Sequence, residues 1–379
     1  MGKFGKKNHV NLDPLSYNIC LLGESKCGKT TIIKEVCEKL VGDDGYIFLE
    51  IGHERGADAI EGISYINTPK WNMDYDEDTN SAGFADVVDD IINNKVSDYQ
   101  NLKVVVWDTY DQLINIAEDE SVRLYNKTVI DKKVKTINQA WGGFGRGEKK
   151  AIEFMLDKFA ELRSVGVSVI VIGHIKTKDM TDPVTGETFQ ILTSDQQQNY
   201  FNALKKNMHF LGLAYIDREI VKEKKKNKAS GNIEKGRIAS ETRKIKFRDD
   251  NYAVDSGSRF ADIVPEIEMN ADDFIKALTG AILSEQKKSN IPLEEEKKRQ
   301  DSEKEKADRH VAEREKEHNT EKNLENIIKQ IKEFCINNKS TPDLIRPLVK
   351  KAKEMGYDSP YDVSDIEDAK VLLGMTKQK

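Results

Sequence analysis

Short apolar runs alternate with longer amphipathic stretches over most of the chain. The runs are Tyr17–Leu22, Tyr46–Ile51, Val104–Trp107 and Val167–Ile172. Because these runs are mainly apolar and rich in β-branched residues, they predict strands that are buried on both faces. Apolar residues at helical spacing, over residues 32–40 and 152–162, predict helices between the strands. Strands that alternate with helices predict an α/β fold with a parallel central sheet and crossover connections.

The pattern changes towards the C-terminus. Arg243–Phe247 followed by Asn251–Val254 predicts a late hairpin, and a helix over Ala271–Leu283 closes the first domain. Residues 285–322 are nearly all Glu, Lys, Arg, Asp and Gln, and such a segment cannot bury a core. It is expected to be either a solvated helix or a flexible linker. A coiled coil is not expected, since no apolar heptad repeats.

The last part of the chain predicts a small three-helix module. The first helix has an apolar face that consists of Leu324, Ile327, Ile328, Ile331 and Phe334. Pro342 begins a second helix, and Ser364 with Glu367 forms a capping box for a third, which ends near Gly374. The predicted organisation is therefore a first domain over 1–283, a charged helix or linker over 284–322 and the helical module over 323–379.

Charge and composition narrow the class of protein only slightly. The chain has 379 residues, of which 33% are charged, and a net charge of −6. The total charge therefore argues neither for nor against nucleic-acid binding. No apolar stretch approaches the roughly 18 residues of a membrane span, and the basic N-terminus lacks an apolar signal core. The cysteines Cys20, Cys27, Cys37 and Cys335 lack paired metal spacing, so we expect free thiols, which fits a reducing cytoplasm. Together with the lack of an apolar span, this predicts a cytoplasmic protein with no membrane association.

The strongest motif follows the first apolar run. Residues 23–31 read GESKCGKTT, which matches the P-loop pattern between a predicted strand and a predicted helix. In such a turn, backbone N–H groups converge on phosphate and the helix N-terminus adds its positive dipole end. Lys29 is expected to reach the β- and γ-phosphates of ATP, and Thr30 to take a Mg²⁺ position. The expected ATP-binding residues are Gly23, Glu24, Ser25, Lys26, Cys27, Gly28, Lys29, Thr30 and Thr31.

An acidic residue ends the third apolar run. Asp108 follows Val104–Trp107, and an acid at this place is expected to hold the hydration shell of Mg²⁺, so Thr30 and Asp108 are the expected metal residues. A GTPase would carry glycine two residues after this acid, whereas the chain has Tyr110 there. No clear arginine-rich lid of a nucleoside kinase is present either.

Four features resemble the RecA-like ATPases. They are the loop GESKCGKT, the acidic strand end FLEIGHE, the strand VVVWD and the strand over 167–173 that is followed by His174. The resemblance implies that a glutamate in FLEIGHE polarises the attacking water, with Glu54 expected and Glu50 as the alternative. It also implies that His174 senses the γ-phosphate, although a histidine at a strand end also occurs for structural reasons. The expected catalytic residues are therefore Lys29, Glu54 and His174.

More narrowly, the chain looks like the phage-encoded RecA-core ATPases of the AAA type, some of which are single-strand annealing proteins. The resemblance rests on IVIGHIK, which contains His174 and Lys176, and on the late segment RKIKFRDDNYAVDSGSRFADI, and it covers roughly residues 10–283. It implies Mg²⁺-dependent ATP hydrolysis, single-stranded DNA as partner, the host cytoplasm as location, and a homo-oligomeric ring or filament. A neighbouring subunit would supply a basic finger, for which the candidates are Arg237, Arg243, Lys244, Lys246 and Arg248.

Two segments occupy the positions of the DNA-binding loops of RecA-like recombinases. They are residues 141–150 (WGGFGRGEKK) and 176–199, and Trp141 and Phe144 offer flat faces for base stacking. The expected DNA-binding residues are Arg146, Lys149, Lys150 and Lys178. A glycine-rich loop with a solvated basic rim would show the same pattern. Residues 222–228 (KEKKKNK) form a further basic run, either along a phosphate backbone or on a solvated hairpin.

Two functions are therefore expected from different classes. The first is an ATP-dependent protein that acts on single-stranded DNA in phage-type recombination or annealing. The alternative is a nucleotide-switched assembly or regulatory ATPase whose C-terminal helices bind a protein partner, which the net negative charge favours.

Overall fold

The computed structural model describes residues 8–130, 133–227, 231–248, 256–289, 291–339 and 341–377, with residues 220–227 and 231–237 described by their backbone alone. The chain divides into two compact units, residues 1–92 with 99–305 and residues 93–98 with 306–379. Within these described ranges, no helix is both long enough and apolar enough to cross a membrane.

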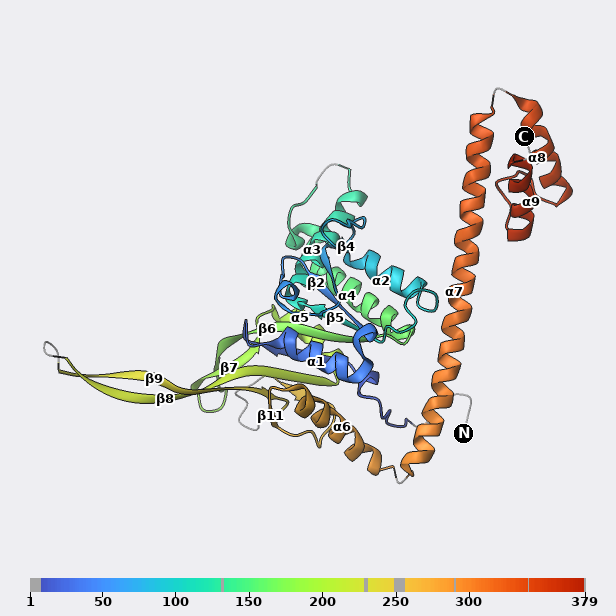
Figure 1. Ribbon diagram of the computed structural model, residues 1–379. Helices are drawn as coiled ribbons and strands as arrows, with labels where there is room; N and C mark the ends of the chain where they lie inside the picture. Colours follow the sequence, from blue (N-terminus) through green and yellow to red (C-terminus); the bar gives the residue numbers. More distant parts are fainter. Residues whose placement is uncertain are drawn as a thin grey trace. The chain divides into compact units, whose positions relative to one another are not determined.

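The first unit is built on a mainly parallel sheet. Its strands are β1 (Ile19–Gly23), β2 (Tyr46–Ile51), β3 (Tyr65–Lys70), β4 (Ser81–Gly83), β5 (Val104–Asp108), β6 (Ser168–Thr181), β7 (Thr188–Ser194), β8 (Phe210–Asn227), β9 (Gly231–Lys246), β10 (Gly257–Ser258) and β11 (Glu266–Glu268). Their spatial order is β11-β9-β8-β1-β6-β5-β2-β3-β4, with β10 beside β8 and β7 beside β6 (Figure 1). From β8 to β4 the neighbours are parallel, whereas β7, β9, β10 and β11 are antiparallel to their partners. The predicted α/β fold with a parallel central sheet is confirmed.

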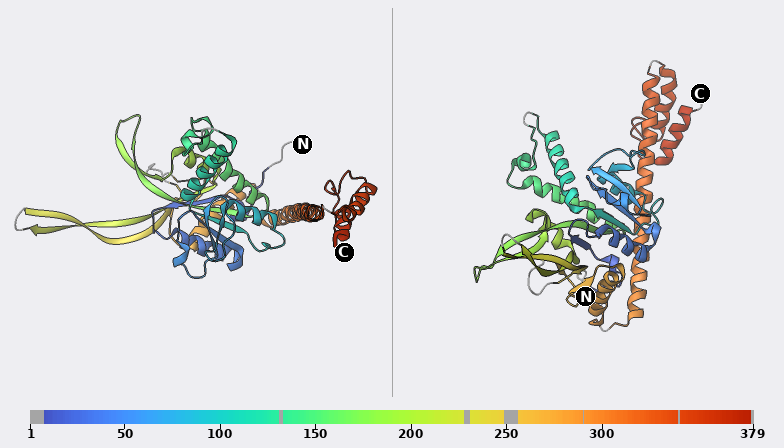
Figure 2. Two further views of the ribbon diagram at one scale, coloured as in Figure 1. Left: turned by 90° about the horizontal axis from the view of Figure 1, so that it is seen from above. Right: turned by 60° about the vertical axis from the view of Figure 1, so that its left-hand side comes forward.

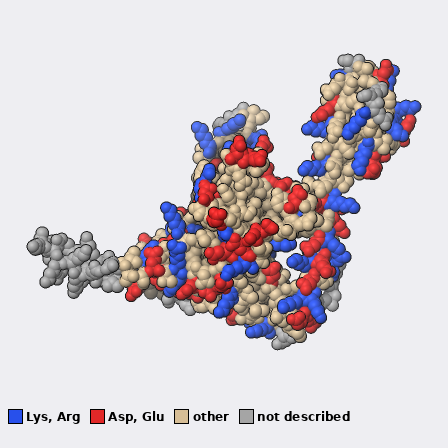
Figure 3. All heavy atoms as spheres, viewed as in Figure 1, with Lys and Arg blue, Asp and Glu red and all other residues tan. Residues whose placement is uncertain are grey.

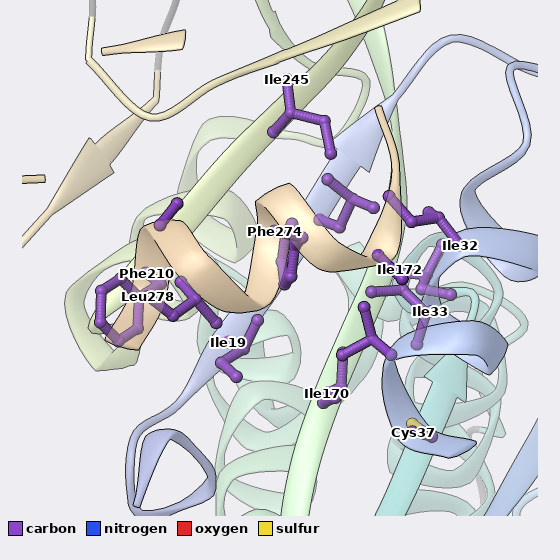
Figure 4. Packing of buried hydrophobic residues seen from close by; sticks show 14 of the residues in the cluster. Ile19, Ile32, Ile33, Cys37, Ile170, Ile172, Phe210, Ile245, Phe274 and Leu278 are labelled. Atoms are coloured by element: carbon purple, nitrogen blue, oxygen red, sulfur yellow. The ribbon is translucent and has the colours of Figure 1, made fainter. Parts of the chain in front are cut away.

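Helices cover both faces of this sheet. The helices of the chain are α1 (Lys29–Val41), α2 (Phe84–Asn93), α3 (Tyr110–Thr128), α4 (Arg146–Ser164), α5 (Gln198–Asn207), α6 (Ala271–Lys287), α7 (Leu293–Asn337), α8 (Pro342–Glu354) and α9 (Ile366–Lys377), and short 3-10 turns lie at Pro14–Ser16, Asp43–Gly45, Ala57–Ala59 and Ile137–Gly142. Ile33 of α1 and Phe274 of α6 pack with strand residues such as Ile170 in one buried cluster (Figure 4). On the opposite face, Trp107 contacts Phe84 and Phe159, with ring centroids 5.4 and 5.6 Å apart. Because both faces are covered, the central strands carry mainly apolar side chains on both faces.

The second unit contains the C-terminal helices. Helix α7 covers the charged segment from Leu293 onwards, so most of that segment is a helix and not a flexible linker, and the same helix continues into the predicted module. Helices α8 and α9 pack beside its last turns (Figure 2). Their buried residues are Ile327, Ile331, Cys335, Leu348, Ala352, Val363, Ala369 and Leu372. The predicted cap of the third helix is wrong by one residue, because Asp365 Oδ1 accepts the N–H groups of Glu367 and Asp368, at 2.8 and 3.1 Å. Gly374 lies inside α9 instead of ending it.

The first predicted DNA-binding loop is mostly helical. Helix α4 begins at Arg146, so the expected loop is reduced to the turn between the 3-10 segment and that helix. Gly143 and Gly145 both have φ of +74° and make this turn possible. Trp141 is also held in place, since its indole N–H donates to the Ser121 carbonyl oxygen at 3.2 Å. Its ring is therefore not free to stack on bases, in contrast to Phe144, whose side chain is fully exposed.

The second predicted loop is a β-hairpin instead. Strands β6 and β7 pair from Ile175 with Ser194 to Thr181 with Thr188. The turn between them is fixed by Asp182, whose Oδ1 accepts the N–H groups of Val184 and Thr185 at 2.7 Å. The sequence already carried this turn signal in Asp-Pro-Val-Thr-Gly.

The late hairpin also differs from the prediction. Residues Arg243 to Lys246 end β9, which pairs with β8 on one side and with β11 on the other. The predicted second strand, Asn251–Val254, lies outside the described residues. Gly23 pairs with His174 of β6 and with Ala214 of β8, and both strands continue beyond that level. The β6–β7 and β8–β9 hairpins therefore extend past the end of β1, from the same edge of the sheet (Figure 2).

Candidate active site

Four strands bring their carboxyl ends to one edge of the sheet. Gly23 of β1 pairs with His174 of β6, and Glu50 of β2 pairs with Asp108 of β5. Parallel strands place their carboxyl ends at the same edge, so side chains that are far apart in the sequence gather there. This edge contains the P-loop, Asp108, both candidate glutamates and His174, as expected from the sequence.

The P-loop itself connects β1 to α1. Lys26 and Gly28 have φ of +61° and +102°, which curls the backbone between the strand and the helix. Lys29 begins α1, and its Nζ donates to the carbonyl oxygens of Gly23 and Glu24 at 3.1 and 2.8 Å. Burial lowers the pKa of Lys29, while nearby acidic groups act in the opposite direction. A desolvated ammonium group inside the curl is suited to a polyanionic ligand such as a triphosphate.

One hydrogen bond joins the P-loop to β5. Thr30 Oγ1 donates to Asp108 Oδ2 at 2.7 Å. Asp108 is 4% exposed, and burial raises its pKa to about 6, although the bond from Thr30 acts to lower it. The peptide bond between Asp108 and Thr109 is cis. The two residues expected to hold Mg²⁺ are thus adjacent to each other.

Glu50 lies beside Asp108 in the same buried region. The Glu50 side chain is 1% exposed, and its Oε1 accepts the N–H of Ala57 at 2.5 Å. Its Oε2 and the neighbouring Thr109 Oγ1 are buried without a hydrogen-bond partner. Burial raises the pKa of Glu50, and the adjacent Asp108 raises it further. Two buried carboxyl groups with raised pKa values and an unpaired oxygen fit a divalent cation, which Thr30, Asp108 and Glu50 would hold together with phosphate oxygens.

Glu54 lies on the turn that follows β2. A Cβ on Gly56 in this turn would lie 3.6 Å from Thr30 Oγ1 and 3.8 Å from Glu50 Oε1, so the turn passes close to the predicted metal residues. Glu54 is partly exposed, and its charge adds to the burial that raises the pKa of Asp108 and opposes the burial that lowers the pKa of Lys29. Its carboxylate is therefore within electrostatic reach of the site, without the burial of Glu50. The catalytic role of Glu54 stays a prediction.

His174 is positioned by a residue that the sequence analysis did not single out. Asp111 Oδ2 accepts the backbone N–H of His174 at 2.9 Å and lies 2.9 Å from His174 Nδ1. Gln196, which follows β7, donates to the other carboxylate oxygen of Asp111. Burial acts to raise the pKa of Asp111, but the bonds to His174 and Gln196 outweigh it, so the pKa is lowered and the carboxylate stays charged. Asp111 thus connects the expected γ-phosphate sensor with the end of the β6–β7 hairpin.

The expected DNA-binding residues lie on helix α4 and on the β6–β7 hairpin. Arg146 and Lys149 are exposed in the first turn of α4. Lys150 forms an ion pair with Glu153 at 3.0 Å, and Lys178 is exposed on the β6–β7 hairpin. The two predicted DNA regions meet where Asn199 Nδ2 donates to Glu148 Oε2 at 3.1 Å.

The fold and this edge of the sheet define a P-loop nucleotide-binding protein. Residues 15–260 match the model of a family described as an AAA domain. Since the match covers more than half of the chain, the chain belongs to this family of AAA-type P-loop ATPases. Among solved structures, it is similar to a KaiC-like protein from the hyperthermophilic archaeon Pyrococcus horikoshii OT3, with 14% identity and a TM-score of 0.28 over 61% of this chain and 77% of that chain. No curated protein matches the chain.

Proposed function

We propose that this chain binds and hydrolyses ATP with Mg²⁺. The observation that supports it best is the hydrogen bond from Thr30 to Asp108, with the unpaired oxygen of Glu50 buried beside it. The backbone of residues 23–31 cradles the phosphates, and Lys29 neutralises charge on the transferred group. Bound Mg²⁺ supplies further charge neutralisation at the phosphate oxygens, and Thr30, Asp108 and Glu50 hold it.

In this proposal Glu54 and His174 complete the site. Glu54 orients the attacking water, because its carboxylate is partly exposed and acts electrostatically on Lys29 and Asp108. His174 contacts the γ-phosphate, and Asp111 holds its ring and transmits its position to Gln196. The presence of the γ-phosphate then biases the β6–β7 hairpin.

We further propose that the chain acts on single-stranded DNA in phage-type recombination or annealing, as a ring or filament in the host cytoplasm. The exposed Arg146, Lys149 and Lys178 support phosphate contacts, and the exposed Phe144 supports base stacking. Figure 3 shows Lys and Arg side chains interspersed with Asp and Glu on the visible face. Binding is therefore expected to depend on these local groups and not on a large basic surface.

The test measures DNA affinity and ATP turnover together. Wild type is expected to bind a single-stranded oligonucleotide more weakly as salt rises, and the oligonucleotide should stimulate ATP hydrolysis. The double variant Arg146→Ala/Lys149→Ala should lose up to about tenfold in DNA affinity. Its affinity should also depend less steeply on salt, since two phosphate contacts are lost. The matched control Lys287→Ala removes an exposed cation from α6 and should bind DNA as wild type does. Absence of binding and of stimulation in the wild type would refute the DNA proposal.

A second candidate function is regulated binding of a protein partner through the C-terminal helices. Helix α8 presents an apolar groove lined by Pro342, Ile345 and Val349, and its rim carries Lys339, Arg346, Lys350, Lys353 and Glu354. Because cations predominate around an apolar floor, the fitting occupant is an amphipathic helix with acidic residues along one face. The probe is a synthetic helix of this kind with glutamates on its polar face. It should bind the full chain and not the Val349→Glu variant; equal affinity for both proteins would count against the groove.

A further inference from the structure

The structure separates the basic residues that were candidates for a finger from a neighbouring subunit. Lys244 Nζ lies 2.9 Å from Asp217 and 3.1 Å from Glu266. Lys246 Nζ lies 3.8 Å from Glu266 and 5.4 Å from the ring centroid of Tyr215. Both lysines are therefore engaged in ion pairs on the surface of the β8–β9–β11 sheet.

Arg243 is different from the other candidates. Arg248 donates to the carbonyl oxygen of Ala261, and the side chain of Arg237 lies outside the described residues. Arg243 is exposed and has no acidic partner within the part of the chain that the structure describes. A Cβ on Gly28 of the P-loop would lie 3.3 Å from Arg243 Nη1. The guanidinium group therefore lies directly against the phosphate-binding loop of its own chain.

The strand pleat explains why Arg243 reaches the loop while Lys244 and Lys246 do not. Successive side chains of a strand point to opposite faces, so Arg243 shares a face with Ile245 and Phe247. Ile245 and Phe247 are fully buried in the cluster that α1 and α6 cover (Figure 4). Arg243 follows the same face outward, beyond the apolar cluster, to the start of α1.

Two hydrogen bonds of Glu24 hold the β8–β9 pair to the loop. The N–H of Glu24 donates to the carbonyl oxygen of Ala214, and Glu24 Oε1 accepts the N–H of Ile216, both at 3.3 Å. Ile216 pairs with Arg243 across β8 and β9. The position of Arg243 is thus fixed relative to the P-loop by the sheet.

We propose that Arg243 binds the phosphate chain of the nucleotide held in the P-loop of the same chain. The inference rests on the proposed binding of ATP. A guanidinium group offers several N–H donors in a fixed plane and pairs well with phosphate oxygens. Gly28, with its φ of +102°, leaves room for this close approach, since a Cβ at that position would be crowded against the guanidinium group. The site therefore has its second cation, after Lys29, in cis.

The first test is the dissociation constant of ATP, measured by calorimetry without DNA. Arg243→Ala should weaken ATP binding about tenfold to a hundredfold, which corresponds to one hydrogen-bonded charge pair. Arg243→Lys should restore part of the affinity, whereas the control Lys246→Ala, on the opposite face of β9, should bind ATP as wild type does. Circular dichroism melting curves check that the variants are folded. Wild-type affinity in folded Arg243→Ala would overturn the inference, whereas absence of ATP binding in the wild type would overturn the proposed function itself.

A mixing experiment distinguishes a residue acting in cis from a trans-acting finger. Arg243→Ala and Lys29→Ala proteins are mixed, and ATP turnover is measured across the mixing ratio. If Arg243 acted in trans, an intact P-loop of one variant would meet an intact arginine of the other, and turnover would rise above that of either protein alone. We expect no such rise. Recovery of turnover in the mixture would overturn the assignment in cis.

Discussion

The site edge of the sheet and the cluster of α7, α8 and α9 differ in the kind of side chain that they bury. At the edge of the sheet in the first unit, Lys29, Glu50 and Asp108 are all less than 10% exposed, at 6%, 1% and 4%. The cluster of α7, α8 and α9 is made of apolar residues and a cysteine, with Ile331 and Leu348 at its centre. Burial of a charge costs free energy that burial of a leucine does not.

This difference indicates which of the two regions is built to bind a charged ligand. A fold that retains three charged side chains in a dry sheet edge, with two unpaired oxygens beside them, is organised around a charged ligand. In the cluster of α7, α8 and α9 the interior contributes packing alone, so any recognition by these helices has to come from their surface.

The largest effect is expected from Lys29→Ala. Removal of the ammonium group should abolish detectable ATP hydrolysis, a loss of about a thousandfold or more, because the phosphates lose their principal cation. The fold should remain intact, since Lys29 is a desolvated cation whose pKa burial lowers. Turnover is measured by phosphate release and folding by thermal melting. Turnover at the wild-type rate in this variant would refute the P-loop assignment.

The two glutamates at the site are expected to give different losses. Glu54→Gln should lower kcat about a hundredfold while ATP and Mg²⁺ binding persist, because it removes the base that orients water. Glu50→Gln should instead raise the Mg²⁺ concentration needed for half-maximal turnover, since Glu50 lies beside Asp108. Titration of Mg²⁺ with each variant separates the two effects. The opposite pattern would exchange the two roles.

The sequence predicted the sheet edge well, for a physical reason. The P-loop, Asp108 and His174 each follow a buried strand, and parallel strands collect their carboxyl ends without any need to know the loops. Asp111 was missed because its role depends on a contact with His174, 63 residues away, and with Gln196, which follows the β6–β7 hairpin. No local pattern encodes such a pairing.

The projecting parts were predicted less well. The length of the β8–β9 pair was not recognised, since its polar strands lack the apolar runs that mark the core. Likewise, Arg243 could not be separated from Lys244 and Lys246 by sequence, because all three are basic residues on one strand. Only the pleat and the neighbouring strands determine which of them meets the P-loop.

A cavity in the C-terminal unit should leave the chemistry of the first unit unchanged. Leu348→Ala removes a side chain that is 1% exposed in the apolar cluster, which should cost about 2 to 3 kcal/mol of that unit's stability. The dissociation constant of ATP should equal that of the wild type. Hydrogen exchange over α8 and α9, compared with that over α1, measures the two units separately. Weaker protection of α1 would show that the two interiors are coupled.

The smallest expected effect is a pH dependence confined to the first unit. His209 Nδ1 accepts the N–H of Asn18 at 3.1 Å, and burial together with the charges of Arg259 and Arg163 lowers the pKa of His209 from its ordinary value of 6.5. The folded state thus holds His209 neutral, whereas the unfolded chain takes up a proton below pH 6.5. Stability of the first unit is therefore complete above that pH and falls as the pH drops through the lowered pKa. In His209→Asn an amide oxygen can accept the same hydrogen bond without titrating, so hydrogen exchange over β1 should depend less on pH. An unchanged pH dependence in this variant would exclude His209 as its source.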